Sequence, residues 1–221
     1  MKNLALVFGG SRGIGAACVE ALKVEFEVSF TSTANVDIRK PDDVKRAFDD
    51  LEARHGRKVD CVVANAGINV PPGPIAQFDP ANFRKLVEVN IVGAFNVLAE
   101  SARRVADGGS IVALSTSLVR HAAPGVGPYS ATKAAVESLV RSMAKELSPR
   151  NIRVNAVAPG PVDTDLFHAG KTDEMKARMA ALSPFNRIGK PGEVAAVVAF
   201  LASSKASWIQ GQVVQPNGGM V

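Results

Sequence analysis

The chain has 221 residues, of which 47% are hydrophobic and 21% are charged, a composition that excludes a disordered or collagen-like polymer. This length predicts one domain spanning residues 1–221. With one tyrosine, one tryptophan and 5% aromatic residues, the core must be built from small aliphatic side chains, as in helix-covered parallel sheets. No apolar run approaches the roughly 20 residues of a membrane span, and the amino-terminal apolar stretch is too short for a secretory signal, so we expect a cytoplasmic protein without membrane association.

The formal net charge of +5 raises the question of a nucleic-acid partner. Lysine and arginine are interleaved with acids, as in RKPDDVKRAFDDLEARHGRK (residues 39–58), which is typical of a solvated helix surface. We therefore expect no nucleic-acid partner and keep that role as the weakest alternative. Cys18 and Cys61 lie in apolar contexts that predict buried free thiols, and no cluster of His, Cys or carboxylates has the spacing of metal ligands.

Apolar runs and helical patterns alternate along almost the whole chain. In chain order the pattern predicts a strand over 4–8, a helix over 14–23, a strand over 24–31, a helix over 41–53, a strand over 59–64, a helix over 82–106, a strand over 110–114, a helix over 129–148, a strand over 152–157, helices over 173–182 and 193–202, and a strand over 212–215. This alternation predicts an α/β fold with a doubly wound parallel sheet and helices on both faces.

One connection is too short for this pattern. Only Thr33, Ala34 and Asn35 separate the strand that ends near Ser32 from the next apolar segment, Val36 to Ile38. A parallel crossover through a helix needs at least about 10 to 12 residues. Either residues 36–38 do not form a parallel strand, or the usual outer strand of the sheet is missing.

A glycine motif, FGGSRGIGAA, follows the first predicted strand and opens the first helix. Gly9, Gly13 and Gly15 there allow backbone N–H groups to approach a pyrophosphate at the amino end of the helix. Their spacing differs from the usual Gly-x-Gly-x-x-Gly dinucleotide fingerprint, so the motif alone is also compatible with a simple tight turn.

A second motif, Tyr129-Ser-Ala-Thr-Lys133, lies at the start of a predicted helix. Residues four apart share a helix face, so the Lys133 ammonium should lie near the phenol and lower the pKa of Tyr129 towards neutrality. That predicts a proton donor to a carbonyl, although such a pair by itself can also be a surface phenol beside a solvated lysine. Three hydroxyls, Ser115, Thr116 and Ser117, precede it at the carboxyl end of a strand, where open parallel sheets bind ligands.

Taken together, these motifs resemble the short-chain dehydrogenase/reductase family over nearly the whole chain. The resemblance rests on GGSRGIG, ANAG, VNIVGAF, GSIVALSTS, PGVGPYSATKAAV, IRVNAVAPG, PVDT and the tail RIGKPGEVA with GQVVQPNGG. It is closest to the ketoacyl-carrier-protein-reductase-like branch, whose members reduce ketones and aldehydes with NADPH. It implies a Rossmann-like sheet of about six strands in which the outer third strand and its preceding helix are missing.

The resemblance also implies catalytic roles. Tyr129 would be the acid/base, Lys133 would bind the nicotinamide ribose and lower the pKa of Tyr129, and Asn90 would hold a water that links the lysine to solvent. The family serine that polarises the carbonyl falls on Thr116, whose hydroxyl donates the same hydrogen bond. Ser115 or Ser117 would take this role after a shift of one residue.

The implied cofactor is NADP(H) rather than NAD(H). No acid ends the second strand to chelate the ribose hydroxyls, whereas Arg12 and Ser32 are placed for a 2′-phosphate. The residues implied to bind the dinucleotide are Gly9, Ser11, Arg12, Gly13, Ile14, Gly15, Ser32, Asp37, Asn65, Ala66, Gly67, Tyr129, Lys133, Pro159, Gly160, Val162 and Thr164. Asp37 would read the adenine amino group.

The expected substrate is a small carbonyl or alcohol that contacts Ser117 and Leu166. Residues 166–184 are expected to form a lid over it. The family habit of pairing the long helices near 82–106 and 129–147 implies a homodimer or homotetramer. Oxidation of an alcohol is as compatible with the chemistry as reduction of a carbonyl. The alternative of another class is a catalytically weak or inactive nucleotide-binding regulator on the same fold, favoured by the compressed segment between Ser32 and Ile38.

Overall fold

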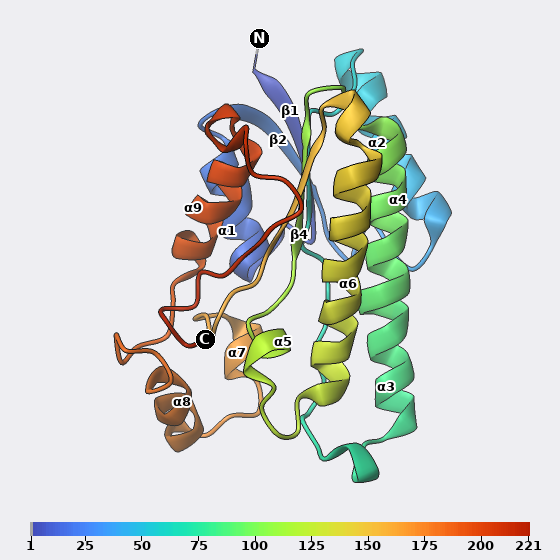
Figure 1. The fold of residues 1–221 in the computed structure, drawn as a ribbon. Helices are drawn as coiled ribbons and strands as arrows, with labels where there is room; N and C mark the ends of the chain where they lie inside the picture. The colour runs from blue at the N-terminus through green and yellow to red at the C-terminus, as the bar shows by residue number, and fades with distance from the viewer. Residues whose placement is uncertain (1) are drawn as a thin grey trace.

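The computed structural model describes residues 2–221 and contains one parallel six-stranded sheet with the strand order β2-β1-β3-β4-β5-β6 (Figure 1). The strands are β1 (Asn3–Phe8), β2 (Phe26–Thr31), β3 (Cys61–Ala64), β4 (Ser110–Leu114), β5 (Arg153–Val157) and β6 (Val213–Val214). The predicted doubly wound α/β fold with six parallel strands is confirmed. β2 begins two residues later than predicted because Val24 lies in the turn before it, with 77% of its surface exposed.

The helices are α1 (Gly13–Leu22), α2 (Pro41–His55), α3 (Pro80–Val87), α4 (Ala94–Arg104), α5 (Leu118–His121), α6 (Gly127–Glu146), α7 (Asp165–His168), α8 (Asp173–Ala180) and α9 (Pro191–Ala202), with short 3₁₀ turns at Ile75–Gln77, Ser148–Arg150 and Ser204–Ala206. The helix predicted over 82–106 is interrupted by a π-helical segment, Glu88–Gly93, between α3 and α4. α3 begins before the predicted start because the Asp79 side chain caps it and Pro80 occupies its first position.

Two apolar cores cover the two faces of the sheet. Alternate residues of β1 point to opposite faces, so Leu6 and Phe8 join the core under α2, α4 and α6, whereas Ala5 and Val7 join the core under α1 and α9. Figure 1 shows these two helix layers on either side of the strands.

The short segment after β2 forms a turn instead of a strand, and β2 becomes an edge of the sheet. The Val36 amide donates to the Ser32 carbonyl at 3.0 Å, which closes the turn. Val36 and Ile38 then enter the core beneath α2, with 8% and 7% of their surfaces exposed. The outer strand and its preceding helix are therefore missing, and two aliphatic side chains seal the end of the core.

Ile38 is held against the π-helical segment. A Cβ added to Gly93 would lie 2.7 Å from the end of the Ile38 side chain, so a larger residue at position 93 would have to displace that side chain. The Asn96 amide also donates to the Ile38 carbonyl at 2.9 Å. These contacts join the compressed segment to the helices that carry part of the candidate site.

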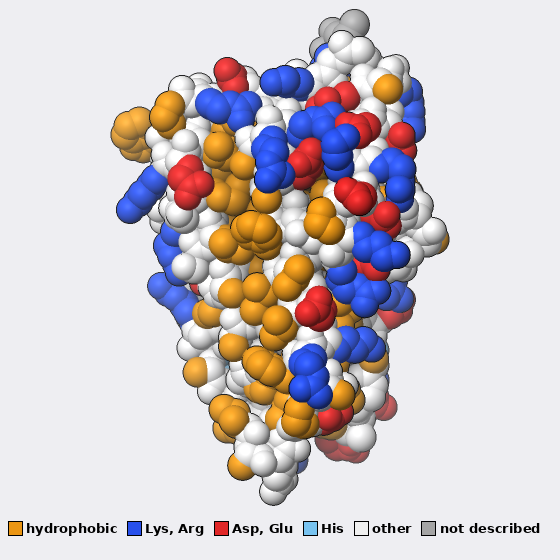
Figure 2. Space-filling view, turned by 90° about the vertical axis from the view of Figure 1, so that its right-hand side faces the viewer, with side chains coloured by type: hydrophobic (Ala, Val, Ile, Leu, Met, Phe, Trp, Pro, Cys, Tyr) orange, Lys and Arg blue, Asp and Glu red, His pale blue; other side chains and the backbone are white. Residues whose placement is uncertain are grey.

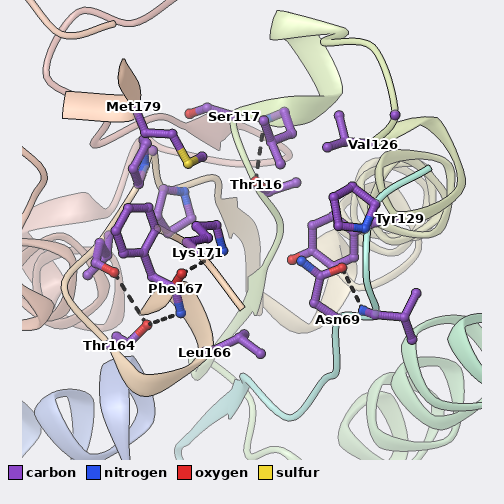
Figure 3. A pocket seen from close by; sticks show the side chains of 18 of the residues that line it. Asn69, Thr116, Ser117, Val126, Tyr129, Thr164, Leu166, Phe167, Lys171 and Met179 are labelled. Atoms are coloured by element: carbon purple, nitrogen blue, oxygen red, sulfur yellow. Dashed lines mark hydrogen bonds between the residues drawn. The ribbon is translucent and has the colours of Figure 1, made fainter. Parts of the chain in front are cut away.

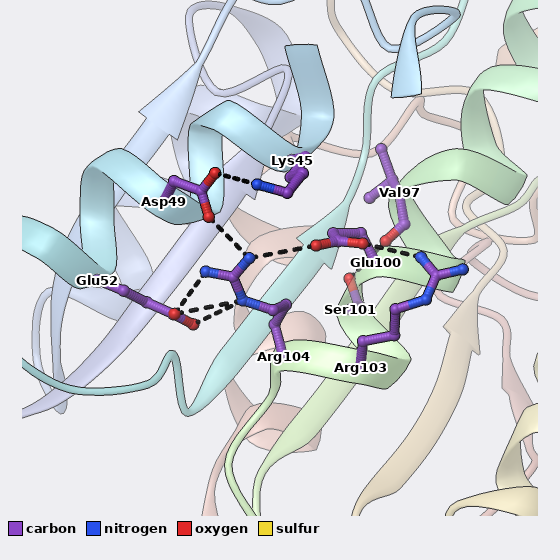
Figure 4. A network of polar contacts seen from close by, with 8 residues as sticks. All are labelled: Lys45, Asp49, Glu52, Val97, Glu100, Ser101, Arg103 and Arg104. Carbon is purple, nitrogen blue, oxygen red and sulfur yellow. Dashed lines mark hydrogen bonds and ion pairs between the residues drawn. The ribbon is translucent and has the colours of Figure 1, made fainter. Parts of the chain in front are cut away.

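The charged residues of α2 pair with one another and with α4 (Figure 4). Arg104 contacts Glu52 at 2.6 Å, Asp49 at 2.8 Å and Glu100 at 3.3 Å, and Lys45 contacts Asp49 at 2.7 Å. Acids and bases are thus interleaved on this face as the sequence predicts, and the excess positive charge does not form a continuous stripe here.

Cys18 and Cys61 are buried free thiols, as predicted. Cys18 lies on α1 and Cys61 on β3, and both belong to the core that α1 and α9 cover. Within the described residues, no helix combines the length and the apolar character that a membrane crossing requires.

Candidate active site

A largely apolar cavity of about 320 Å³ lies at the carboxyl ends of β4 and β5. Its walls come from the Asn69–Pro72 loop, the segment after β4, the start of α6, the loop after β5, and helices α7 and α8 (Figure 3). Among the predicted site residues it gathers Ile14, Thr116, Ser117, Tyr129, Pro159, Gly160, Val162, Thr164 and Leu166. The volume is within the range of small-molecule sites.

The three hydroxyls after β4 have different hydrogen-bond partners. Ser115 donates to the Glu137 carboxylate at 2.7 Å, and Ser117 donates to the Ala158 carbonyl at 2.7 Å. Thr116 only accepts, from the Leu118 amide at 3.3 Å. Because the protons of Ser115 and Ser117 are engaged within the protein, Thr116 is the one of the three with a proton left to donate to a ligand.

Tyr129 and Lys133 lie one turn apart near the start of α6, but their electrostatics differ from the prediction. The Lys133 amine is buried and donates to the Leu114 carbonyl at 2.9 Å, and burial lowers the pKa of Lys133 to about 8. Burial also raises the pKa of Tyr129 to about 12. The predicted lowering of the Tyr129 pKa is therefore wrong for this structure, because desolvation of the phenol outweighs the neighbouring amine.

Asn90 sits in the π-helical segment and is fully buried. Its side chain accepts from the Ile68 amide and donates to the Ile68 carbonyl, both at 2.9 Å, and donates to the Thr132 hydroxyl at 3.2 Å. A Cβ on Gly67 would lie 3.2 Å from the Asn90 oxygen and 3.3 Å from the Lys133 nitrogen. Asn90 therefore fixes the loop after β3 beside Lys133, a contact that the sequence did not predict.

A second cavity, of about 180 Å³, lies at the carboxyl ends of β1 and β3. Its lining includes the predicted dinucleotide residues Gly9, Ser11, Arg12, Gly13, Ile14, Gly15, Ser32, Asn65, Ala66, Gly67 and Thr164, together with Thr33, Asp165 and Leu166. Ile14, Thr164 and Leu166 line both cavities, so the two form neighbouring parts of one elongated site.

The glycines of this second cavity are required by close contacts. A Cβ on Gly9 would lie 2.9 Å from the Ala66 backbone, and one on Gly15 would collide with the Gly9 carbonyl. Gly9 and Gly13 also have φ angles of 79° and 54°, which favour glycine. No side chain among the described residues caps the start of α1, and its first turn carries no acid. Free N–H groups at a helix amino terminus fit the pyrophosphate of a dinucleotide.

Two residues expected at the adenosine end of the site are placed differently from each other. Ser32 lines the cavity, and its backbone amide donates to the Asn35 side-chain oxygen at 2.7 Å. Asp37 lies in neither cavity and binds the Arg39 guanidinium at 2.7 and 2.9 Å, which lowers the pKa of Asp37 to about 2. The structure therefore does not bring the Asp37 carboxylate to the predicted dinucleotide site.

The segment predicted as a lid contains α7 and α8 beside the first cavity. Phe167, Met175 and Met179 contribute apolar wall, and Lys171 brings an amine to it. Sequence reasoning did not single out Lys171 or Asn69, because neither belongs to a recognisable motif. They line the cavity because the fold brings the loops that carry them to the carboxyl ends of the strands.

Comparisons with known proteins support this arrangement. A family model described as enoyl-(acyl carrier protein) reductase matches residues 5–221. A protein of Arabidopsis thaliana named NADPH-dependent aldehyde reductase-like protein, chloroplastic, is 36% identical over 254 residues, covering 99% of this chain and 94% of its own. That span is longer than the present chain, so this relative contains residues without a counterpart here.

Two further matches come from bacteria. The 3-oxoacyl-(acyl-carrier-protein) reductase FabG of Staphylococcus epidermidis is 35% identical over 220 residues, covering 99% of this chain and 88% of its own. A short-chain dehydrogenase of Burkholderia cenocepacia, solved in complex with NADP, superposes with a TM-score of 0.90 at 28% identity, covering 99% of this chain and 97% of its own. The chain therefore belongs to the short-chain dehydrogenase/reductase family of NAD(P)-dependent oxidoreductases.

Proposed function

We propose that the protein is an NADP(H)-dependent carbonyl reductase that uses Tyr129 as its acid/base. The observation that carries the proposal is the single elongated site, in which the glycine-lined cavity at β1 continues into the cavity that holds Tyr129 and Thr116. A bound nicotinamide would supply the hydride to the carbonyl carbon. The relatives named as reductases of aldehydes and of 3-oxoacyl groups support this class of substrate.

Thr116 and Tyr129 would bind the carbonyl oxygen. The Thr116 hydroxyl donates a hydrogen bond, which polarises the C=O bond and positions it. As the carbonyl carbon accepts the hydride, the Tyr129 phenol gives its proton to the oxygen, so the C=O bond becomes C–O–H. A raised pKa suits Tyr129 to remain protonated until charge develops on the oxygen.

Lys133 and Asn90 would act around this step. Lys133 lies beside Gly67, which lines the dinucleotide cavity, and its amine would bind the nicotinamide ribose there. The Lys133 amine would re-supply the proton to Tyr129, and the water that Asn90 would hold would link the lysine to solvent.

Arg12 and Ser32 support the preference for NADP(H). Both line the dinucleotide cavity, and the guanidinium of Arg12 is exposed at its edge, where a 2′-phosphate would gain a charge-assisted hydrogen bond. Asp165, the one acid of this lining, belongs to α7 and not to the end of β2, where an acid would chelate the ribose hydroxyls of NAD(H).

A second candidate function is a nucleotide-binding regulator with little or no turnover. It is favoured by the compressed segment 32–40, which leaves the Asp37 carboxylate on Arg39 instead of at the site. The two candidates separate on one question, which is whether bound cofactor is consumed.

A homo-oligomer fits the apolar surface over α3, the π-helical segment and α4. Figure 2 shows hydrophobic side chains gathered on this face of the molecule. Phe83, Val92 and Phe95 belong to it, with 42%, 37% and 52% of their surfaces exposed. A pair of chains that buries this face against α6 of its partner is our proposal for the assembly. A cytoplasmic location stays a prediction, since the name of the Arabidopsis thaliana relative places that protein in the chloroplast.

The experiment that tests the proposed function is NADPH consumption with a panel of aldehydes and ketones. We expect turnover by the wild type and a fall in kcat of about 10²- to 10⁴-fold for Tyr129→Phe, the range for removal of a general acid. The thermal unfolding temperature of the variant serves as the control for folding. Equal rates for the two proteins would refute the role of Tyr129, and NADPH binding without any turnover would favour the regulator.

A further inference from the structure

Lys171 is the only ionisable cation among the residues described as lining the active-site cavity. Its neighbours in that lining are apolar or carry hydroxyls and amides, and the aliphatic, proline, phenylalanine and methionine side chains form most of the wall. An ammonium in such a wall is costly unless it finds hydrogen-bond acceptors or opposite charge. We therefore expect the Lys171 ammonium to have a hydrogen-bond acceptor or a negatively charged group beside it.

The contacts of Lys171 satisfy the amine only in part. Nζ donates to the Phe167 carbonyl at 2.5 Å and lies 5.1 Å from the centre of the Phe167 ring. An ammonium has three donors, so this leaves two N–H groups for another acceptor. No carboxylate within residues 2–221 forms an ion pair with it, and burial lowers the pKa of Lys171. The half-buried amine thus keeps N–H groups that no protein group among the described residues accepts.

The position of Lys171 fits recognition of the distal part of a substrate. It lies between α7 and α8, and Figure 3 shows it beside Phe167, across the cavity from Tyr129. A substrate whose carbonyl meets Thr116 and Tyr129 would extend over the apolar wall, and its far end would reach the amine. A cavity of about 320 Å³ limits that substrate to a small molecule.

We propose that the substrate is a carbonyl compound with a short apolar body and a carboxylate, and that Lys171 binds the carboxylate. A single ammonium matches the one negative charge of a carboxylate, and the described lining holds no second cation for a phosphate dianion. The carboxylate is unchanged by the reaction, so Lys171 is a specificity-determining residue. This inference rests on the proposed function, because it assigns a substrate class to the same site.

The test compares acid and ester forms of one aldehyde. The probes are 4-formylbenzoate and 3-formylbenzoate with their methyl esters, assayed with NADPH. We expect the wild type to have a higher kcat/KM for at least one acid than for its ester. We expect Lys171→Met to lower this acid-to-ester ratio about 10- to 100-fold, the effect of losing a hydrogen bond to a charged group. Lys176→Met is the matched control, since the Lys176 amine pairs with Asp173 on α8.

A binding measurement separates failure of this inference from failure of the proposed function. Calorimetry with the NADP⁺-loaded protein would compare 4-methylbenzoate with 4-methylbenzamide, which need no turnover. Tighter binding of the benzoate that is lost in Lys171→Met supports the inference even if no aldehyde is reduced. An acid-to-ester ratio and a benzoate affinity that are both the same in the wild type and in Lys171→Met would overturn it.

Discussion

The segment after β2 and the segment from β4 to α6 differ in the side chains that they bury. The first buries aliphatic side chains, and the second buries hydrogen-bonded polar groups. Residues 32–40 replace a helix and a strand with one turn, and Val36 and Ile38 fill the core at the edge of the sheet. Residues 114–133 instead keep buried polar groups, among them Lys133 on the Leu114 carbonyl and Ser115 on Glu137. The first region is built for packing, and the second keeps groups that packing alone would not favour.

The difference shows why the sheet tolerates the loss of its outer strand. The predicted catalytic residues come from the π-helical segment, the loop after β4 and α6, and the glycine motif comes from the end of β1 and the start of α1, so none of them lies on the missing elements. The loss is confined to the adenosine end of the site, where Asp37 binds Arg39 instead of lining the cavity. Removal of an edge element therefore changes how one end of a cofactor is held and leaves the reaction centre in place.

The largest expected effect is a loss of folding stability when the buried side chain of the compressed segment is truncated. Ile38→Ala should destabilise the protein by about 3 kcal/mol, because it removes a buried aliphatic side chain and leaves a cavity. Urea unfolding measures this change. Ile75→Ala is the control, since 80% of Ile75 is exposed and its truncation should cost less than about 0.5 kcal/mol. A cost for Ile38→Ala as small as that of the control would show that the compressed segment is not part of the core.

The next largest expected effect is a loss of NADPH affinity at the adenosine end of the site. Arg12→Gln should weaken NADPH binding about 10- to 100-fold, through loss of a charge-assisted hydrogen bond, and weaken NADH binding much less. Calorimetric titration of both cofactors measures the change. Lys23→Gln removes the same charge just after the other end of α1 and should leave the NADPH-to-NADH ratio unchanged. If Arg12→Gln weakens both cofactors equally, the 2′-phosphate is not recognised by Arg12.

The smallest expected effect is a pH-dependent change in folding stability that comes from the buried amine of Lys133. Burial lowers the pKa of Lys133 from 10.5 to about 8, so the unfolded chain binds the proton more tightly than the folded protein. This destabilisation is complete below pH about 8 and is relieved as the pH rises towards 10.5. Relative to Lys133→Met, the wild type should gain about 1 kcal/mol of stability between pH 7 and pH 9.

Urea unfolding of both proteins at these two pH values measures the gain. The difference between wild type and variant cancels the titration of the other groups, which both proteins share. A difference that stays constant with pH, or that moves in favour of the variant as the pH rises, would contradict the lowered pKa of Lys133.

Much of the fold follows from the sequence because its signals are local. Continuous apolar runs predict β1, β3 and β4 within one or two residues, and the short link after Ser32 predicts the missing outer strand. The π-helical segment at Glu88–Gly93 is not predicted, because it lies within an otherwise regular helical pattern and packs Gly93 on Ile38, 55 positions away in the chain. The short helices α5 and α7 are missed because four residues carry no periodic pattern.

The sequence predicts the parts of the site in which a motif determines the backbone. It does not predict which hydrogen-bond partner each side chain has. The glycine motif and Asn65 to Gly67 do line one cavity. The sequence left Ser115, Thr116 and Ser117 as alternatives, and only their hydrogen bonds distinguish them. Spacing placed Lys133 near Tyr129 but did not reveal that desolvation raises the pKa of the phenol. Side-chain partners and burial are properties of the whole fold, so short motifs do not encode them.

The most direct test of the account is the transfer of deuterium from NADPH labelled at the reactive C4 position to an aldehyde. The compressed adenosine end and the Tyr129 site must act together for this transfer to occur. We predict that the wild type places the label on the alcohol carbon of the product, and that Tyr129→Phe transfers it far more slowly. Tight NADPH binding by the wild type without any label in the product would contradict the central claim.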